Sequence, residues 1–270
     1  MEVKNLAWNK NLSKRCNHPL LPKGIRGLII GKSGCGKTTL LINLLLRPGW
    51  LDYNNINIFG KNLFQPEYDI LKKAFEEKLA KEVIIRLFEY QNEITDLGIS
   101  PISVVEEMAK DIRDKSDVEC KFYESAEDVP DPRELSSHKK NLMVFDDLLL
   151  EKQNTCESYY VRGRHRNVDC FYLAQNYFKL PRQTMRENAN FICLLPQDLK
   201  NLNYIFDDHV GSNMTKEEFR QLCKTAWEKQ HRFIITDFNS KKTTANIEVS
   251  LMNFTYQIKI IFSLKNGESS

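Results

Sequence analysis

Short apolar runs recur along the chain, and stretches with helical periodicity separate them. The runs that predict buried strands are 27–30, 56–59, 142–145, 170–174, 191–195 and 233–236. Helical patterns cover residues 38–46, about 67–80, 103–115, 156–164 and 219–229. Strands that alternate with helices indicate βαβ units. We therefore expect an α/β fold with a mainly parallel central sheet and helices on both of its faces.

The same pattern divides the chain into segments. Residues 1–25 form a polar, basic lead-in, and residues 26–238 form one domain with a charged, proline-bearing surface insertion at 116–140. Residues 83–88 fit either a strand or a helix, because a short apolar run does not settle the period. Residues 239–270 are expected to be a C-terminal tail or an edge hairpin, since they alternate and are rich in β-branched and aromatic residues.

Composition and charge narrow the class of protein. Of the 270 residues, 41% are hydrophobic, which is enough for a packed core, and the net charge of +3 neither requires nor excludes a nucleic-acid partner. The seven cysteines are scattered without a C-x-x-C pair, which indicates reduced thiols inside a cell. No apolar stretch approaches the roughly 18 residues that span a bilayer, so we expect no membrane span.

A phosphate-binding loop is the strongest motif. The segment from Gly31 to Thr38 matches G-x-x-x-x-G-K-[ST] and lies between a predicted strand and a predicted helix. Glycines let the backbone wrap closely around phosphate oxygens, and the N–H groups at a helix start attract anions. Lys37 is expected to reach the β- and γ-phosphates of ATP and to be catalytic, and Thr38 to bind Mg²⁺. The residues predicted to bind nucleotide are Gly31, Lys32, Ser33, Gly34, Cys35, Gly36, Lys37, Thr38 and Thr39.

Two acidic residues directly follow the predicted strand 142–145. Asp146 is suited to hold the shell of the Mg²⁺ ion, and Asp147 is suited to orient or deprotonate the attacking water. ATP-hydrolysing relatives more commonly carry Glu at the second position. Because Asp147 is one methylene shorter, it fills this role only with a closer backbone or a second water.

An amide pair ends the next predicted strand, 170–174. Ligands lie at the carboxyl ends of the strands of a parallel sheet. We therefore expect Gln175 to face the γ-phosphate, where its amide contacts both the attacking water and a phosphate oxygen. The alternative is that Gln175 is only a polar residue at the end of a strand.

Arginine residues gather between and after these two strands. They are Arg162, Arg164, Arg166, Arg182 and Arg186. A guanidinium delivered from a neighbouring subunit is worth about 10³- to 10⁵-fold in the rate of phosphoryl transfer. Arg164 and Arg162 are the first candidates for such a catalytic finger, and Arg186 is the next. The cluster also fits contacts to nucleic-acid phosphates, or a solvated basic helix end.

The order of these motifs resembles that of the poxvirus-type genome-packaging ATPases of the FtsK–HerA superfamily. The most specific part is the phrase RGRHRN…YLAQNYFKLPR, in which Gln175 follows the acidic pair, and the resemblance covers roughly residues 25–200. It implies a P-loop ATPase domain of the additional-strand, RecA-like type. It also implies that Lys37 and Thr38 bind phosphate and Mg²⁺, and that Gln175 is the sensor amide.

For function, the resemblance implies an ATP-hydrolysing motor that translocates double-stranded viral DNA into a capsid. The expected partners are double-stranded DNA, further copies of the chain in a homo-oligomeric ring, and a capsid or portal-vertex protein. The expected location is the site of virus assembly in the host cytoplasm or nucleus, or the virion itself. Residues 103–115 and the basic pair Lys139 and Lys140 are candidates for contact with DNA or with a neighbouring subunit.

Other functions stay open at this point. The first alternative is a HerA-like DNA translocase or helicase without a capsid role. A second class comprises proteins that are not motors: a small-molecule kinase, a GTPase switch, or a nucleotide-binding scaffold without turnover. The sequence contains no N-K-x-D or T-K-x-D motif that would read guanine, and no compact arginine-rich lid of the nucleotide-kinase kind.

Overall fold

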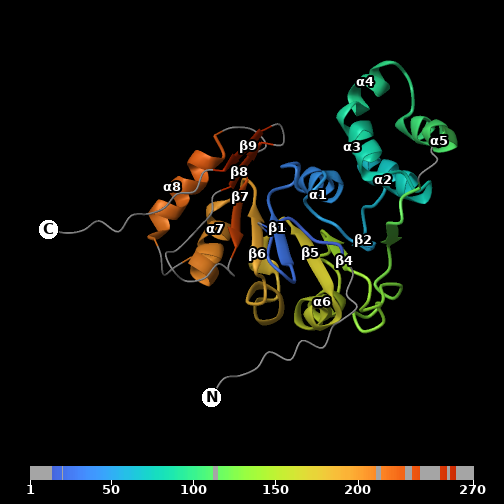
Figure 1. Ribbon diagram of the computed structural model, residues 1–270. Helices are drawn as coiled ribbons and strands as arrows, with labels where there is room; N and C mark the ends of the chain where they lie inside the picture. The colour runs from blue at the N-terminus through green and yellow to red at the C-terminus, as the bar shows by residue number, and fades with distance from the viewer. Residues whose placement is uncertain are drawn as a thin grey trace.

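A seven-stranded sheet forms the centre of the computed structural model, which describes residues 14–19, 21–111, 115–210, 214–228, 233–237, 250–253 and 256–259 (Figure 1). The strand order is β3-β2-β4-β5-β1-β6-β7. The strands are β1 (Arg26–Ile30), β2 (Asn55–Gly60), β3 (Glu119–Tyr123), β4 (Asn141–Asp146), β5 (Val168–Ala174), β6 (Phe191–Leu194) and β7 (Ile234–Asp237). All neighbouring strands pair in parallel except β6 and β7, which are antiparallel. The predicted α/β class with a mainly parallel sheet is confirmed.

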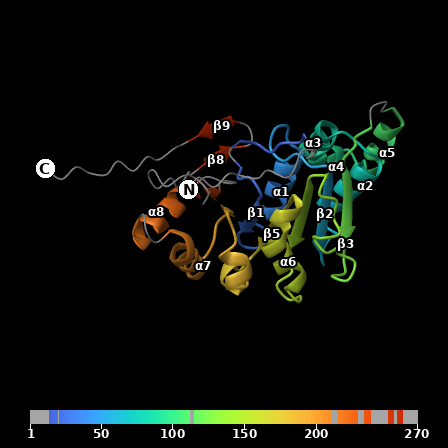
Figure 2. The ribbon, with the colours of Figure 1, turned by 60° about the horizontal axis from the view of Figure 1, so that its bottom comes forward.

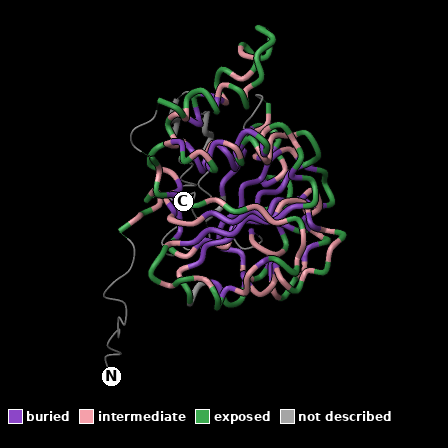
Figure 3. Tube along the Cα trace, turned by 90° about the vertical axis from the view of Figure 1, so that its right-hand side faces the viewer, coloured by how far each residue is buried: buried purple, intermediate pink, exposed green. Residues whose placement is uncertain are grey.

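Helices cover both faces of this sheet. They are α1 (Lys37–Leu46), α2 (Pro66–Glu76), α3 (Lys81–Glu89), α4 (Gln91–Asp96), α5 (Pro101–Asp111), α6 (Asn154–Arg162), α7 (Leu199–Ile205) and α8 (Lys216–Ala226). Successive side chains of a strand point to opposite faces, so Ile29 packs into the core under α1, α2 and α3, whereas Leu28 and Ile30 pack into the core under α6, α7 and α8. Buried strands therefore run between two outer layers, as Figures 2 and 3 show.

The position of β5 sets the type of fold. β5 lies between β1 and β4, with Ile30 opposite Ala174 on one side and Phe145 opposite Tyr172 on the other. The strand that precedes the glycine loop and the strand that ends in the acidic pair are thus separated by one additional strand. This confirms the expected additional-strand type, and it places the carboxyl ends of β1, β5 and β4 side by side.

The structure settles the open segment and adds one strand. Residues 83–88 belong to helix α3 rather than to a strand. The segment 116–140, expected to be a surface insertion, instead contributes β3, which pairs with β2 at the edge of the sheet. Because no β3 side chain is fully buried, its sequence ECKFY carries little apolar signal. In the tail, β8 (Ser250–Asn253) and β9 (Tyr256–Lys259) form a separate antiparallel pair.

The described part of the lead-in packs onto the domain. Arg15 forms ion pairs with Asp52 and Asp117, while Leu21 and Ile25 are buried. Helices α3, α4 and α5 extend from the sheet on the side of α2 (Figure 1). Among the described residues, none of the helices has the length and apolar character needed to cross a bilayer.

Candidate active site

The glycine loop joins the end of β1 to the start of α1. Gly34 and Gly36 have φ angles of +71° and +94°, which side-chain-bearing residues rarely adopt. A Cβ atom on Gly31 would lie 2.4 Å from Cys35 Sγ and 2.8 Å from Leu195 Cβ, so only glycine fits there. The Gly31 N–H donates to the Ala174 carbonyl at 3.1 Å, which ties the loop to the end of β5.

Lys37 and Thr38 lie at the first turn of α1, beside this loop. The Lys37 ammonium donates to the carbonyls of Gly31 and Lys32 at 3.0 and 2.9 Å, so its charge lies across the loop. The first turn of α1 contains no acidic residue, so nothing on the helix offsets the positive end of its dipole. The loop thus combines backbone N–H groups, a helix N-terminus and an ammonium, the combination that binds phosphate.

A pocket of about 310 Å³ opens over the loop at the carboxyl edge of the sheet. Of the residues predicted from the sequence, it is lined by Ser33, Gly34, Gly36, Lys37, Thr38, Thr39, Asp146, Asp147 and Gln175. Gly31, Lys32 and Cys35 do not line it. Asn62, Gln65 and Glu67 also line it, and the sequence analysis missed these three because they follow β2, far from any motif.

Asp146 ends β4 inside this pocket. The hydroxyl of Tyr68, a fully buried residue of α2, donates to Asp146 Oδ2 at 2.6 Å. Burial raises the pKa of Asp146, the hydrogen bond from Tyr68 lowers it, and the charge of Asp147 raises it further. Burial and the charge of Asp146 raise the pKa of Tyr68, while a hydrogen bond with Thr38 lowers it. Tyr68, which the sequence analysis missed, therefore joins the two predicted Mg²⁺ ligands.

The donor set formed by Thr38 and Asp146 fits Mg²⁺. This ion commonly binds through one or two carboxylates together with substrate phosphates and several waters. Thr38 supplies a hydroxyl and Asp146 a carboxylate, and both line the pocket that the phosphate-binding loop surrounds. The remaining positions around the ion are left to phosphate oxygens and water.

Asp147 and Gln175 contact each other directly. The Gln175 side-chain amide donates to Asp147 Oδ2 at 2.5 Å. The backbone of Asp147 has a φ of +50°, in the left-handed region, and its N–H donates to the Leu173 carbonyl at 3.1 Å. The Gln175 carbonyl in turn accepts a hydrogen bond from the side chain of Gln197 at 2.7 Å. The structure thus brings the amide at the end of β5 against the acidic pair.

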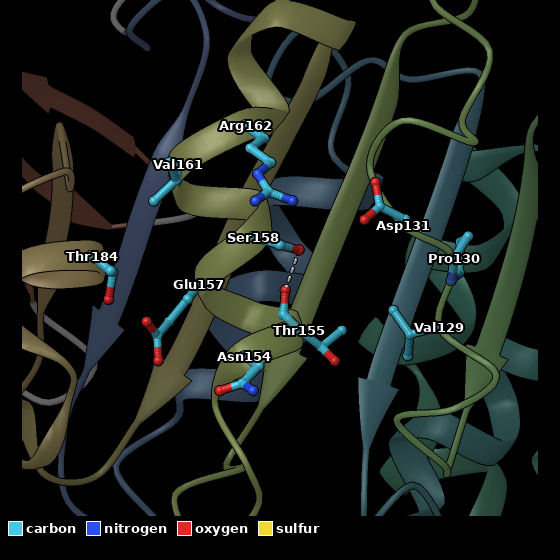
Figure 4. A pocket seen from close by; sticks show the side chains of 10 residues that line it. All are labelled: Val129, Pro130, Asp131, Asn154, Thr155, Glu157, Ser158, Val161, Arg162 and Thr184. Atoms are coloured by element: carbon cyan, nitrogen blue, oxygen red, sulfur yellow. Dashed lines mark hydrogen bonds between the residues drawn. The ribbon is translucent and has the colours of Figure 1, made fainter.

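The candidate arginine fingers lie away from this pocket. Arg162 ends α6, and the turn Gly163–Arg166, which contains Arg164, leads into the amino end of β5. Arg162 lines a different cleft, of about 530 Å³, together with Asp131 and Glu157 (Figure 4). The side chain of Arg164 lies outside the described residues. Arg162 therefore lines a different cleft from the nucleotide pocket of its own chain, and the turn that carries Arg164 lies at the opposite end of β5 from Gln175.

Two further basic candidates are held within the chain. Arg186 is 7% exposed and forms an ion pair with Asp208 at 2.9 Å, so its guanidinium has a partner within its own chain. Lys140 is turned inward, where its ammonium donates to Asn17 Oδ1 at 2.6 Å and lies 4.7 Å from the centre of the Tyr53 ring. The prediction that the basic pair Lys139 and Lys140 contacts DNA or a neighbouring subunit stays a prediction, although the Lys140 ammonium has partners within the chain.

The glycine loop, the acidic pair and the additional strand occur together at one edge of one sheet. The chain has the fold of an additional-strand P-loop NTPase. No protein-family model and no curated protein matches the sequence.

Several solved structures are similar to this P-loop fold. The genome packaging NTPase B204 from Sulfolobus turreted icosahedral virus 2, in complex with AMP, is 14% identical, with a TM-score of 0.45 over 82% of this chain and 95% of that one. VirB4 of Thermoanaerobacter pseudethanolicus is 12% identical, with a TM-score of 0.42 over 78% and 86%. EssC (ATPases 2 and 3) from Geobacillus thermodenitrificans is 14% identical, with a TM-score of 0.39 over 80% and 38%.

Proposed function

We propose that the protein is an ATPase motor that translocates double-stranded DNA during the packaging of a virus genome. One observation carries the ATPase part of this proposal. Lys37, Thr38, Asp146 and Gln175 converge on one pocket, although they come from three different strand ends. A P-loop that only binds nucleotide needs neither the acidic pair nor the amide beside it.

Each residue of the pocket has a role in hydrolysis. The loop N–H groups and Lys37 hold the β- and γ-phosphates and offset the negative charge that spreads over them in the transition state. Thr38 and Asp146 would hold Mg²⁺, which, when bound, neutralises charge on the β- and γ-phosphates. Gln175 orients the attacking water, and its contact with Asp147 fixes the amide for that purpose.

The motor part of the proposal is supported by the resemblance in the segment from Arg162 to Pro181. Arg162 and Arg164 are the first candidates for the catalytic finger. Their backbone lies just before β5, at the amino edge of the sheet, whereas the nucleotide pocket lies at the carboxyl edge. A ring of identical subunits gives them a role, because a neighbour's arginine can complete the site of the next subunit. The same ring would enclose the DNA and dock on a capsid or portal-vertex protein at sites of virus assembly.

The ATPase activity is tested with Lys37→Ala. We expect the rate of phosphate release to fall about 10³-fold or more, because the phosphates lose a preorganised charge in the transition state. Lys72→Ala, on the exposed side of α2, is the matched control and should retain the wild-type rate. Hydrolysis by Lys37→Ala at the wild-type rate would contradict the proposed site.

The motor activity needs a separate measurement. We expect duplex DNA to raise the ATPase rate and native mass to show a ring in the presence of ATP. Translocation on duplex DNA with and without procapsids then distinguishes a packaging motor from a translocase without a capsid role. A monomer whose ATPase rate ignores DNA would rule out both kinds of motor and leave a nucleotide-binding protein.

A further inference from the structure

The first turn of α2 enters the nucleotide pocket, and no motif in the sequence marks it. β2 lies beside β4, so the chain that leaves β2 passes the acidic pair before α2 begins at Pro66. Tyr68 then fixes this turn to Asp146 through its hydroxyl. One residue earlier, Glu67 is half-buried and lines the pocket together with Lys37 and Thr38. The pocket thus contains a carboxylate from α2 in addition to those of Asp146 and Asp147.

The acidic residues of this turn also have an ordinary explanation. Carboxylates in the first turn of a helix stabilise it through the helix dipole. Glu67 and Asp69 both occupy the first turn of α2, and the dipole acts on both. Only Glu67 lines the nucleotide pocket, whereas Asp69 is exposed and lines another cleft beside α4 and α5. Asp69 therefore provides an internal reference for the effect of the helix dipole alone.

Besides Asp146, two carboxylates line the pocket, those of Asp147 and Glu67. They differ in their hydrogen-bond partners. Asp147 Oδ2 accepts a hydrogen bond from the Gln175 amide at 2.5 Å, so this oxygen already has a partner within the chain. No described residue forms a hydrogen bond or an ion pair with the side-chain carboxylate of Glu67. This side chain is also one methylene longer than that of Asp147.

We propose that Glu67, rather than Asp147, is the carboxylate that accepts the proton of the attacking water. This proposal rests on the proposed ATPase function. In the step, the water oxygen forms a bond to Pγ, and the bond between Pγ and the β–γ bridging oxygen breaks with its electron pair passing to ADP. One proton of the water moves to Glu67 and is later released to solvent. Asp147 acts as a positioning residue that holds the Gln175 amide.

The test compares three substitutions in the otherwise complete chain. They are Glu67→Gln, Asp69→Asn and Asp147→Asn. Phosphate release gives kcat, a fluorescent ATP analogue gives nucleotide affinity in the presence of Mg²⁺, and thermal unfolding reports whether each variant is folded. Wild-type turnover is measured first, since its absence would overturn the proposed function before Glu67 is tested.

We expect Glu67→Gln to lower kcat about 10²-fold or more, because general-base catalysis contributes factors of that size. Its nucleotide affinity should stay within about twofold of wild type, since a neutral amide fills the same space. Asp69→Asn should keep the wild-type kcat, and Asp147→Asn should lose less than Glu67→Gln. With an active wild type, a kcat of Glu67→Gln equal to that of Asp69→Asn would overturn the proposal. So would a larger loss in Asp147→Asn.

Discussion

Two carboxylates on neighbouring strands, one half-buried and one buried, show how the two edges of the sheet differ. Asp146 ends β4 at the carboxyl edge, and Asp169 lies near the start of β5 at the amino edge. Burial is the largest influence on both, and it raises the pKa of each. Asp169 accepts hydrogen bonds from the Ile25 N–H at 2.8 Å, the Tyr53 hydroxyl at 2.6 Å and the Asn17 side chain at 3.2 Å.

Asp146 has a different set of neighbours. Its Oδ2 accepts one hydrogen bond, from Tyr68, and the residue lines the pocket with Lys37 and Thr38. The shared direction of the pKa shift therefore does not separate a structural carboxylate from a functional one. The two carboxylates differ in whether the protein itself supplies their hydrogen-bond donors. The protein supplies three donors to Asp169, whereas Asp146 lines a pocket that has room for a ligand.

Asp146→Asn should produce the largest effect on activity. Loss of this carboxylate removes a ligand of Mg²⁺, and we expect kcat to fall about 10³-fold because metal charge stabilisation contributes several kcal/mol. The free energy of unfolding should not fall, since a carboxylate with a raised pKa is replaced by a neutral amide. Denaturant unfolding and phosphate release measure the two effects. A destabilised but active variant would place Asp146 in the same class as Asp169.

Asp169→Ala should show the reverse pattern. We expect a loss of about 3 kcal/mol in the free energy of unfolding, because the buried donors of Ile25 and Tyr53 lose their partner. ATPase activity per folded molecule should be unchanged, since Asp169 lies at the opposite edge of the sheet. The two are compared by urea unfolding and by phosphate release below the melting temperature. A stable variant with impaired turnover would break the comparison.

Tyr68→Phe sharpens the comparison by removing the hydroxyl that donates to Asp146 Oδ2. The carboxylate and Thr38 then lose the hydroxyl that holds them, and we expect the Mg²⁺ concentration for half-maximal nucleotide binding to rise about 10-fold. Nucleotide binding measured in EDTA should not change, which separates metal positioning from general damage to the loop. An equal loss with and without Mg²⁺ would contradict this role for Tyr68.

The smallest effect concerns pH and the stability contributed by Asp169. Its pKa in the folded protein is raised, so the folded state holds this proton more tightly than the unfolded state does. The contribution of Asp169 to stability is therefore greatest below the ordinary pKa and declines as pH rises through the raised one. The gap in unfolding free energy between wild type and Asp169→Asn should widen on acidification, by about 1.4 kcal/mol per unit of pKa shift. Burial raises the pKa of Asp169, whereas its hydrogen bonds and the charge of Lys140 lower it. A gap that narrows would mean that the lowering influences outweigh burial.

The parts of the site that the sequence predicted are contiguous or follow apolar strands. The loop from Gly31 to Thr38 carries its chemistry in eight adjacent residues, and Asp146 and Gln175 directly follow short apolar runs that predict buried strands. Their convergence then follows from the parallel sheet. The P-loop fold and the core of the pocket were therefore predictable from local patterns and one rule of topology.

The rest depends on which strands become neighbours. Tyr68 and Glu67 reach the pocket because β2 pairs with β4, and nothing local to β2 specifies that pairing. Strand β3 was missed because an exposed edge strand needs few apolar residues. The contacts of the Lys140 ammonium with Asn17 and Tyr53 were not predicted, because a basic pair gives no sign of partners that are distant in sequence. Each of these features is set by tertiary contacts between distant segments.

The central place of β1 has a consequence for how the protein is made. β1 ends at Ile30, but it pairs with β5, which begins at Val168, and with β6, which ends at Leu194. The glycine loop is thus synthesised well before both of the strands that pair with β1. Contacts this distant in sequence close slowly and late. We therefore expect the nucleotide site to form only after β6 has been synthesised.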